Sequence, residues 1–174
     1  MKIDCARFSF AVLTMSDKGS RGERNDTSGS FLVDCLSSEG YRKEEYAIVP
    51  DIVAVIRDTL ITWVDEKKID LIVTTGGTGV APTDITPEAM VEVIEKEIPG
   101  MAEAMRAESL KKTPNAVLSR GKAGIRGRTL IINLPGSERA ARDNIAVLLP
   151  SLAHAIDKIQ GGKSDCGVGV KNSA

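Results

Sequence analysis

The stretch Ile69–Thr75, followed at once by Gly76-Gly77-Thr78-Gly79, constrains the fold more than any other feature of the chain. Its β-branched residues predict a buried strand. The glycines allow positive φ and let consecutive N–H groups approach an anion, and the threonine hydroxyls add donors. A lone glycine pair would indicate only a tight turn, but this loop has more glycines than a turn needs. We therefore expect a strand that ends in a loop for a phosphate or another oxyanion.

Two kinds of apolar pattern alternate along the rest of the chain. Short apolar runs predict further strands at Phe8–Thr14, Tyr41–Val49 and Arg128–Asn133. Apolar residues spaced three or four apart predict helices between the strands. The first helix is expected from Asp26 or Thr27 to Gly40, the second over 52–64 with Asp51 as N-cap, and the third from Thr86 to about Glu97. A fourth helix should start at Pro99 and turn Met101, Ala102, Met105 and Leu110 inward. The last should run from Ser137 to Ile159 with an interruption near Pro150. Strands that alternate with helices predict an α/β fold with a mostly parallel sheet flanked by helices.

The length of the chain, 174 residues, fits a single domain with a sizeable core. Its apolar fraction of 42% and charged fraction of 27% are those of an ordinary globular protein. We expect the domain to span residues 1–160. Residues 161–174 are rich in Gly, Lys and Ser and are predicted to form a flexible tail.

Charge and composition favour a small-molecule ligand over a macromolecular one. The net charge is −1, so no overall positive field draws the chain to nucleic acid or to an anionic membrane. Aromatic residues make up only 3% of the chain, which argues against binding by base stacking. Cys5, Cys35 and Cys166 are widely spaced and odd in number, as expected of free thiols in a reducing compartment. With no apolar run long enough to span a bilayer, we expect the protein in the cytoplasm.

Asp51 and Asp84 both follow the carboxyl end of a predicted strand. Because parallel strands end at the same edge of a sheet, both carboxylates should lie where ligands bind in such folds. Two carboxylates together with substrate phosphates are a common way to hold Mg²⁺. Asp51 could equally be only a helix cap. For Asp84 a capping role is less persuasive, because Thr86 is the better cap.

Two other polar loops should open on the same edge. Ser16-Asp17 follows the first strand, and Pro135-Gly136-Ser137 follows the last. Each could be no more than a connecting loop. The single histidine, His154, lies in an apolar helical stretch and is read as a packing residue, so catalysis that depends on a histidine base is not expected.

The chain resembles the molybdopterin adenylyltransferases, a family that includes the bacterial Mog and MoaB proteins and the G domain of gephyrin. The resemblance rests on the order of several motifs: Thr14-Met15-Ser16-Asp17, Asp26-Thr27-Ser28-Gly29, Val49-Pro50-Asp51, Thr74 to Gly79, Thr83 to Ala89, Ile98-Pro99-Gly100, Leu118-Ser119-Arg120 and Asn133 to Ser137. It implies a doubly wound sheet and a homotrimer. It also implies that Asp51 and Asp84 match the family's two essential acidic residues. The implied substrate-binding residues are Ser16, Asp17, Thr75, Gly76, Gly77, Thr78, Gly79, Ser119, Pro135, Gly136 and Ser137.

The resemblance implies a reaction in which the phosphate of molybdopterin attacks the α-phosphorus of Mg-ATP and pyrophosphate leaves. The attacking phosphate is already an anion, so the reaction needs no general base, and Asp51 and Asp84 would hold Mg²⁺. Two alternatives stay open: a MoaB-like protein that binds molybdopterin with weak or no activity, and a Mg²⁺-dependent nucleotide hydrolase. Hand-over of the product to a metal-insertion protein of the same pathway is a further expectation.

Overall fold

The computed structural model describes residues 3–162, which form one α/β domain. A six-stranded sheet has the order β2-β1-β3-β6-β5-β4. The elements, in chain order, are η1 Cys5–Arg7, β1 Ser9–Met15, α1 Asp17–Ser20, α2 Thr27–Ser38, β2 Arg42–Val49, α3 Val53–Asp65, β3 Leu71–Thr75, α4 Thr86–Val93, β4 Lys96–Glu97, α5 Pro99–Leu110, η2 Pro114–Leu118, β5 Ala123–Arg126, β6 Thr129–Leu134 and α6 Glu138–Ile159. Most of the predicted tail, residues 163–174, lies outside the described part of the chain.

The four neighbouring strands β2, β1, β3 and β6 are parallel, and the remaining two, β5 and β4, pair in antiparallel fashion. β1 pairs with β2 on one side and with β3 on the other, and β3 pairs with β6. β5 and β4 extend the sheet as an antiparallel edge. The parallel strands β1, β3 and β6 are buried along their whole length, as expected of a sheet covered on both faces. The predicted α/β fold with a mostly parallel sheet is confirmed.

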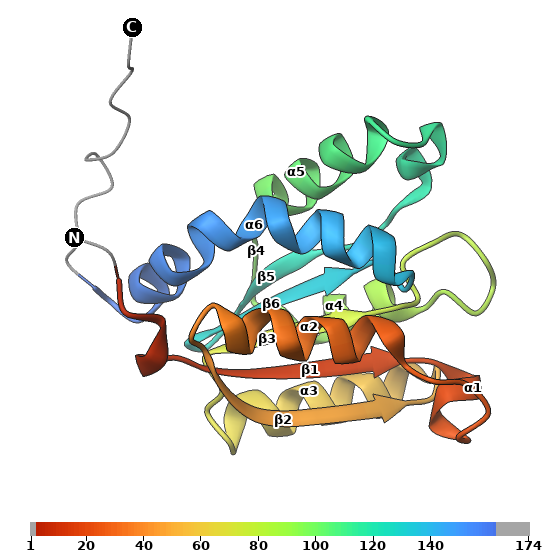
Figure 1. Cartoon of the computed structure of the whole chain (residues 1–174). Helices are drawn as coiled ribbons and strands as arrows, with labels where there is room; N and C mark the ends of the chain where they lie inside the picture. The colour runs from red at the N-terminus through yellow and green to blue at the C-terminus, as the bar shows by residue number, and fades with distance from the viewer. Residues whose placement is uncertain (1–2, 163–174) are drawn as a thin grey trace, which may run out of the picture.

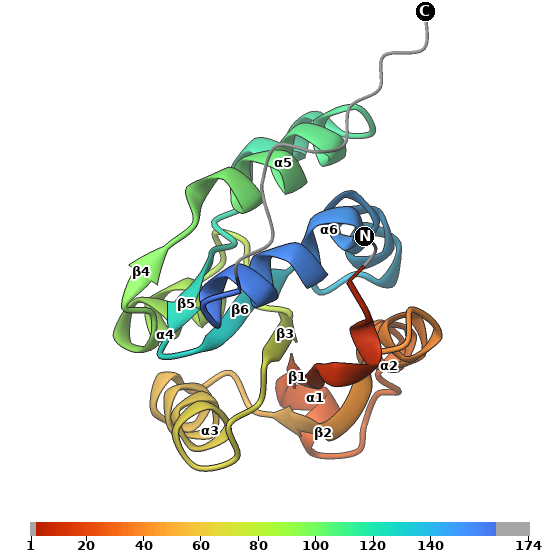
Figure 2. The same ribbon diagram turned by 90° about the vertical axis from the view of Figure 1, so that its left-hand side faces the viewer.

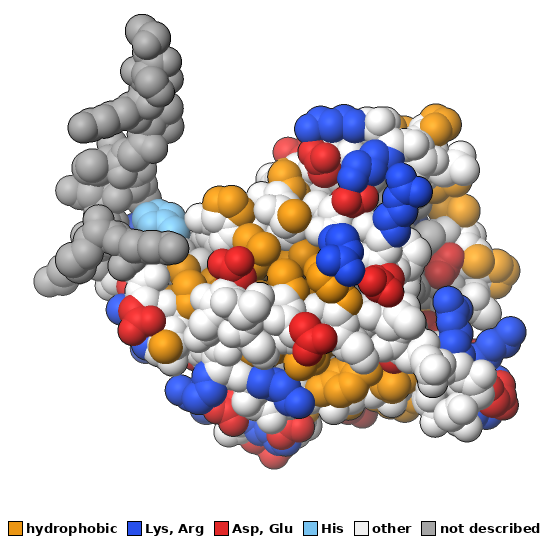
Figure 3. Space-filling model, viewed as in Figure 1, with side chains coloured by type: hydrophobic (Ala, Val, Ile, Leu, Met, Phe, Trp, Pro, Cys, Tyr) orange, Lys and Arg blue, Asp and Glu red, His pale blue; other side chains and the backbone are white. Residues whose placement is uncertain are grey.

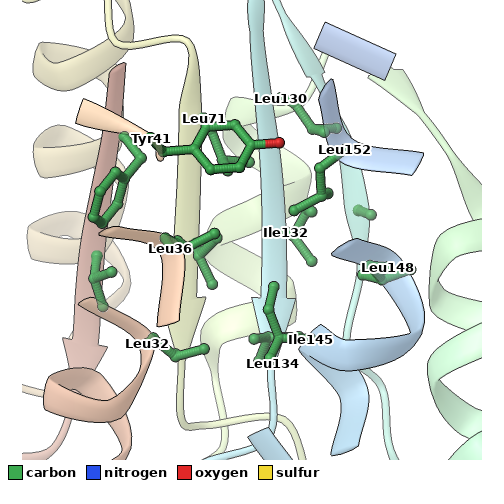
Figure 4. Packing of buried hydrophobic residues seen from close by; sticks show 14 of the residues in the cluster. Leu32, Leu36, Tyr41, Leu71, Leu130, Ile132, Leu134, Ile145, Leu148 and Leu152 are labelled. Atoms are coloured by element: carbon green, nitrogen blue, oxygen red, sulfur yellow. The ribbon is translucent and has the colours of Figure 1, made fainter. Parts of the chain in front are cut away.

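Helices cover both faces of the sheet (Figures 1 and 2). On one face, α2, α5 and α6 pack over a core that includes Leu32, Leu36, Ile132, Leu148 and Leu152 (Figure 4). On the other face, α3 and α4 pack over a second core built around Ile56, Leu60, Trp63, Ile72 and Met90. This doubly wound arrangement leaves the carboxyl edge of the parallel strands open between the two layers.

The helix predicted from Thr86 to Glu97 is shorter than expected. It ends at Val93, because the chain turns to an extended conformation at Ile94 and then pairs with β5. The N–H of Glu95 donates to the carbonyl of Ile125, and the N–H of Ile98 donates to that of Ala123. The antiparallel partner strand β5 was not predicted, nor was the short helix α1 in the loop after β1.

Three further local predictions were wrong. The expected interruption at Pro150 is absent, and α6 runs through it. Pro150 and Ala146, whose carbonyl would have accepted its missing N–H, are both exposed, so that carbonyl can bond to water. Asp51 is not a cap, since Ile52 occupies the N-cap of α3. On α5, Ala102 and Met105 are buried and Met101 is half-buried, but Leu110 is 46% exposed.

Candidate active site

A cavity of about 300 Å³ opens at the carboxyl ends of the parallel strands. Its walls come from the loops after β1, β2, β3 and β6 and from the N-terminal turn of α2. Many of the residues predicted from the sequence line it: Ser16, Asp51, Thr75, Gly76, Gly77, Asp84, Gly136 and Ser137. The fold therefore brings both predicted acidic residues and the glycine loop to one place.

The glycine loop is shaped by close backbone contacts. Gly76 has φ 108° and Gly77 has φ 61°. A Cβ on Gly76 would lie 2.5 Å from the carbonyl oxygen of Met15, and one on Gly77 would lie 2.3 Å from Oγ1 of Thr86. A Cβ on Gly136 would lie 3.2 Å from Cα of Gly76. Glycine is therefore required at positions 76 and 77, and the backbone packs closely at Gly136.

Side-chain hydrogen bonds hold the loop from beneath. The buried amide of Asn133 donates to Oγ1 of Thr74 at 3.0 Å and to the carbonyl of Gly76 at 3.3 Å. The hydroxyl of Thr75 donates to the carbonyl of Pro135 at 2.8 Å. The Thr75 hydroxyl thus ties the loop after β3 to the loop after β6, and is not the free donor to an anion that we expected.

Asp51 is held by Asp17, which lies outside the cavity wall. The N–H of Asp51 donates to Oδ1 of Asp17 at 3.0 Å, and the N–H of Asp17 donates to Oδ2 of Asp51 at 3.1 Å. Burial raises the pKa of Asp51, and the negative charges of Asp17 and Asp84 raise it further, against the hydrogen bond from the N–H of Asp17. Asp17, predicted to bind substrate, is here a partner of Asp51.

Asp84 lies across the glycine loop. Its Oδ2 accepts the N–H of Ala81 at 2.9 Å and would lie 2.6 Å from a Cβ on Gly79. Thr86 was predicted to be the N-cap of the helix α4. It is instead the first residue of α4, and Ile85 is the N-cap. Asp84 is therefore free of a capping role and faces the same cavity as Asp51.

These carboxylates suit a hard divalent cation. Within residues 3–162, no group of three or more His, Cys, Asp and Glu is placed to hold a metal by itself. Mg²⁺, however, commonly takes only one or two carboxylates and completes its shell with phosphate oxygens and water. No lysine or arginine in the described residues forms a salt bridge with Asp51 or Asp84, and their mutual repulsion raises the pKa of Asp51. The pair fits Mg²⁺ brought by a phosphorylated substrate.

The remaining predicted residues, except Asp17, line a second cavity. This cavity, of about 380 Å³, adjoins the first and shares Ser137 with it. Thr78, Gly79, Ser119 and Pro135 lie in its wall, together with Lys112, Arg139 and Asp143. Ser137 also caps α6 by accepting the N–H of Ala140 at 3.3 Å. Apart from Asp17, the predicted binding residues are thus divided between two neighbouring cavities that meet at Ser137.

Asp26 is a site residue that sequence reasoning treated only as a possible helix cap. It does cap α2, with Oδ1 accepting the N–H of Gly29 at 2.9 Å, but it also lines the first cavity. Its Oδ2 accepts the hydroxyls of Thr14 and Tyr46. Burial alone would raise the pKa of Asp26, but these hydrogen bonds outweigh it and hold the pKa below its usual value. Burial and the bond to Asp26 raise the pKa of Tyr46 to about 12.

The surface adds little to the assignment. Basic and acidic side chains are interspersed over the face shown in Figure 3, with no large area of one sign. Among the described helices, none has the length and apolar character that a bilayer crossing requires.

Comparison with known proteins gives the same assignment as the site. The family described as probable molybdopterin binding domain matches residues 11–154. A molybdopterin adenylyltransferase of Helicobacter pylori is 45% identical over 152 residues, which cover 86% of each chain. The structure of the molybdopterin biosynthesis enzyme MoaB from Thermus thermophilus has a TM-score of 0.83 at 49% identity, covering 88% of this chain and 97% of that one. A MogA structure has a TM-score of 0.83 at 40% identity, covering 87% of this chain and 99% of that one. The chain therefore belongs to the molybdopterin-binding domain family, whose members named molybdopterin adenylyltransferase are nucleotidyltransferases.

Proposed function

We propose that this protein transfers the adenylyl group of Mg-ATP to the phosphate of molybdopterin. In this reaction a phosphate oxygen of molybdopterin forms a bond to the α-phosphorus of ATP, the bond from that phosphorus to the bridging oxygen breaks, and pyrophosphate leaves. The observation that carries the proposal is the pair of cavities that meet at Ser137, one of which holds the two carboxylates and the glycine loop.

The two cavities suit the two substrates differently. Asp51 and Asp84 in the first cavity match the magnesium-bound phosphates of ATP. The second cavity combines the apolar side chains of Ala116, Leu118 and Pro135 with a few polar groups, which suits a flat pterin ring. A phosphate of the pterin substrate would then reach the boundary at Ser137, where the α-phosphorus must also lie.

The protein's part in this reaction is to position charges. The attacking phosphate is ionised at neutral pH, so no residue has to remove a proton from it. When bound, Mg²⁺ would neutralise negative charge on the reacting phosphates. Asp51 and Asp84 would hold the cation, and the N–H of Gly77 would bind a phosphate oxygen. The N–H of Gly76 instead donates to the carbonyl of Leu134 at 3.1 Å. Fixed geometry and preorganised charge are the usual source of rate in such transfers.

Pyrophosphate release by the purified protein tests the proposal. With molybdopterin and Mg-ATP together we expect pyrophosphate and adenylylated molybdopterin in equal amounts, and neither product when either substrate is left out. Turnover of ATP without molybdopterin would instead identify a nucleotide hydrolase. Tight molybdopterin binding without pyrophosphate would identify a MoaB-like binding protein.

Three further expectations belong to this proposal. We expect a homotrimer, which sedimentation at micromolar concentration would reveal, and a clean monomer would contradict it. The expectation of a homotrimer rests on the family resemblance. We also expect the protein to act in the cytoplasm and to hand its product to a metal-insertion protein.

A further inference from the structure

The segment between the glycine loop and Asp84 projects from the carboxyl edge of the sheet (Figure 1). Its residues Val80 to Thr83 are exposed, and Val80 is 63% exposed. Apolar packing therefore does little to fix this part of the backbone. A stretch with so few buried contacts would open easily unless polar interactions hold it.

Arg120, which lies just beyond η2, supplies such interactions. Its Nε donates to the carbonyl of Gly79 at 2.7 Å, and its Nη2 donates to the carbonyl of Asp84. Its Nη1 pairs with Glu88 on the first turn of α4, and this contact lowers the pKa of Glu88. The backbone N–H of Arg120 donates to the carbonyl of Thr78 at 2.8 Å. One residue thus binds both ends of the projecting segment and the helix that follows it.

We infer that Arg120 is a positioning residue for the Asp84 carboxylate, acting by holding Gly79 and Asp84 in place together. Arg120 lines neither cavity of the site, so its effect on the reaction would pass through the residues it binds. The Asp84 carboxylate lies against Gly79, so a shift at either end of the segment would move it. The planar fork of an arginine can bind several acceptors at once, which a single ammonium group cannot do.

This inference rests on the proposed adenylyl transfer, and its test begins with wild-type protein and Asp84→Asn. If wild-type protein releases no pyrophosphate, the proposed function fails and the kinetic part of the test does not apply. If wild-type protein is active, Arg120→Ala should lower kcat about ten- to hundredfold, since a displacement near 1 Å can cost that much. The KM for ATP should change little, because the substrate contacts remain. Arg120→Lys should recover part of the loss.

Arg126 offers a matched control. It also binds a carboxylate, that of Asp65, and a backbone carbonyl, that of Val93, but it lies away from both cavities. Arg126→Ala should leave kcat unchanged. A fall in kcat equal to that of Arg120→Ala would mean that losing any such arginine impairs the fold, and would overturn the inference.

A double-mutant cycle tests whether Arg120 acts through Asp84. The variant with both Arg120→Ala and Asp84→Asn should be no slower than Asp84→Asn alone, since residues that act as one unit are not additive. If the double variant is slowed by the product of the two single effects, Arg120 acts independently of Asp84, which would overturn the inference. Amide hydrogen exchange provides a readout without turnover: Arg120→Ala should speed exchange within residues 79–84 and leave the core strands protected. Unchanged exchange there would also overturn the inference.

Discussion

Asp17 and Asp51 are bound to each other through both of their backbone N–H groups, each of which donates to the other's carboxylate. The two loops that follow β1 and β2 are joined at this point, and Asp51 forms part of the cavity wall. Asp17, which does not line the cavity, thereby holds Asp51, which does.

Asp17→Ala removes the acceptor for the N–H of Asp51 and should release the loop after β2. We expect the rate of adenylyl transfer to fall about ten- to hundredfold from misplacement of the Asp51 carboxylate. Asp17→Asn keeps an oxygen acceptor and should stay within a few-fold of wild type. Pyrophosphate release by the two variants is the measurement, and equal losses in both would point to the charge of Asp17 rather than its hydrogen bond.

Asp84→Asn should stop turnover without disturbing the loop. The amide oxygen can still accept the N–H of Ala81, but the negative charge that attracts Mg²⁺ is gone. Loss of one electrostatic contact in the transition state corresponds to about 3–4 kcal/mol, or roughly a hundred- to thousandfold in rate. Molybdopterin affinity, measured by titration, should survive.

The exposed Asp58 on α3 is the control for this change, since its side chain is 65% exposed and forms a salt bridge with Arg57. Asp58→Asn should leave the rate alone and change stability by less than about 0.5 kcal/mol. Wild-type turnover in Asp84→Asn would falsify its catalytic role. Lost molybdopterin binding would move Asp84 from the metal site to the pterin pocket.

Gly76→Ala should destabilise the fold as well as the site. The residue would have to keep φ 108° with its Cβ 2.5 Å from the carbonyl oxygen of Met15. The backbone conformation alone costs about 1–3 kcal/mol in a non-glycine residue, and the clash adds to it. In contrast, Gly100→Ala on α5 meets nothing within 4 Å and should leave stability unchanged or raise it by up to about 1 kcal/mol. Urea unfolding of both variants compares them, and equal stabilities would contradict the close approach.

Asp26 should make stability depend on pH in acid. Its pKa is lower in the folded chain than in the unfolded one, so the unfolded chain binds more protons as the pH falls. The stabilisation is present above the ordinary aspartate pKa of about 3.9 and is lost as the pH falls through the lowered value. Asp26→Asn, which leaves the hydroxyl donors of Thr14 and Tyr46 facing an amide, should be less stable by about 1–3 kcal/mol near neutral pH. The gap in Tm between the two proteins should shrink below about pH 4, and a constant gap down to pH 2 would show that the ionised form of Asp26 is not the source.

The elements that the sequence predicts correctly are those whose apolar pattern extends over at least five residues. β1, β3 and β6 are five to seven residues long and buried throughout, so each stands out in the sequence as a largely continuous apolar run. β4 has only two residues, and β5 has four, including Gly124. Neither strand is long enough to show an apolar pattern in the sequence. Helix α4 ends because β4 pairs with β5, and this pairing is not visible in the composition of either strand. Helix α6 continues through Pro150 because the backbone hydrogen bond that a proline cannot make would lie on the exposed side of the helix.

The same division holds for the site. The grouping of Asp51, Asp84 and the glycine loop at one cavity could be predicted because parallel strands must bring the loops after them to one edge. Arg120 lies 36 positions from Asp84 in the sequence. Its contact with Asp84 depends on the path of the chain after η2, which local spacing does not show. Local spacing also could not show that Asp17 faces Asp51 rather than the cavity, since the two are 34 positions apart.

The order of the strands in the sheet bears on how the protein is made. β3 lies between β1 and β6, and the hydroxyl of Thr75 reaches Pro135, which is translated 60 positions later. Parallel strands pair only through long crossovers, and such distant contacts form slowly. At about 5–20 residues per second, several seconds of synthesis separate the glycine loop from the turn that completes its wall. A nascent chain on the ribosome therefore has no complete cavity, and its substrates can be bound only after the last strand has emerged and taken its place.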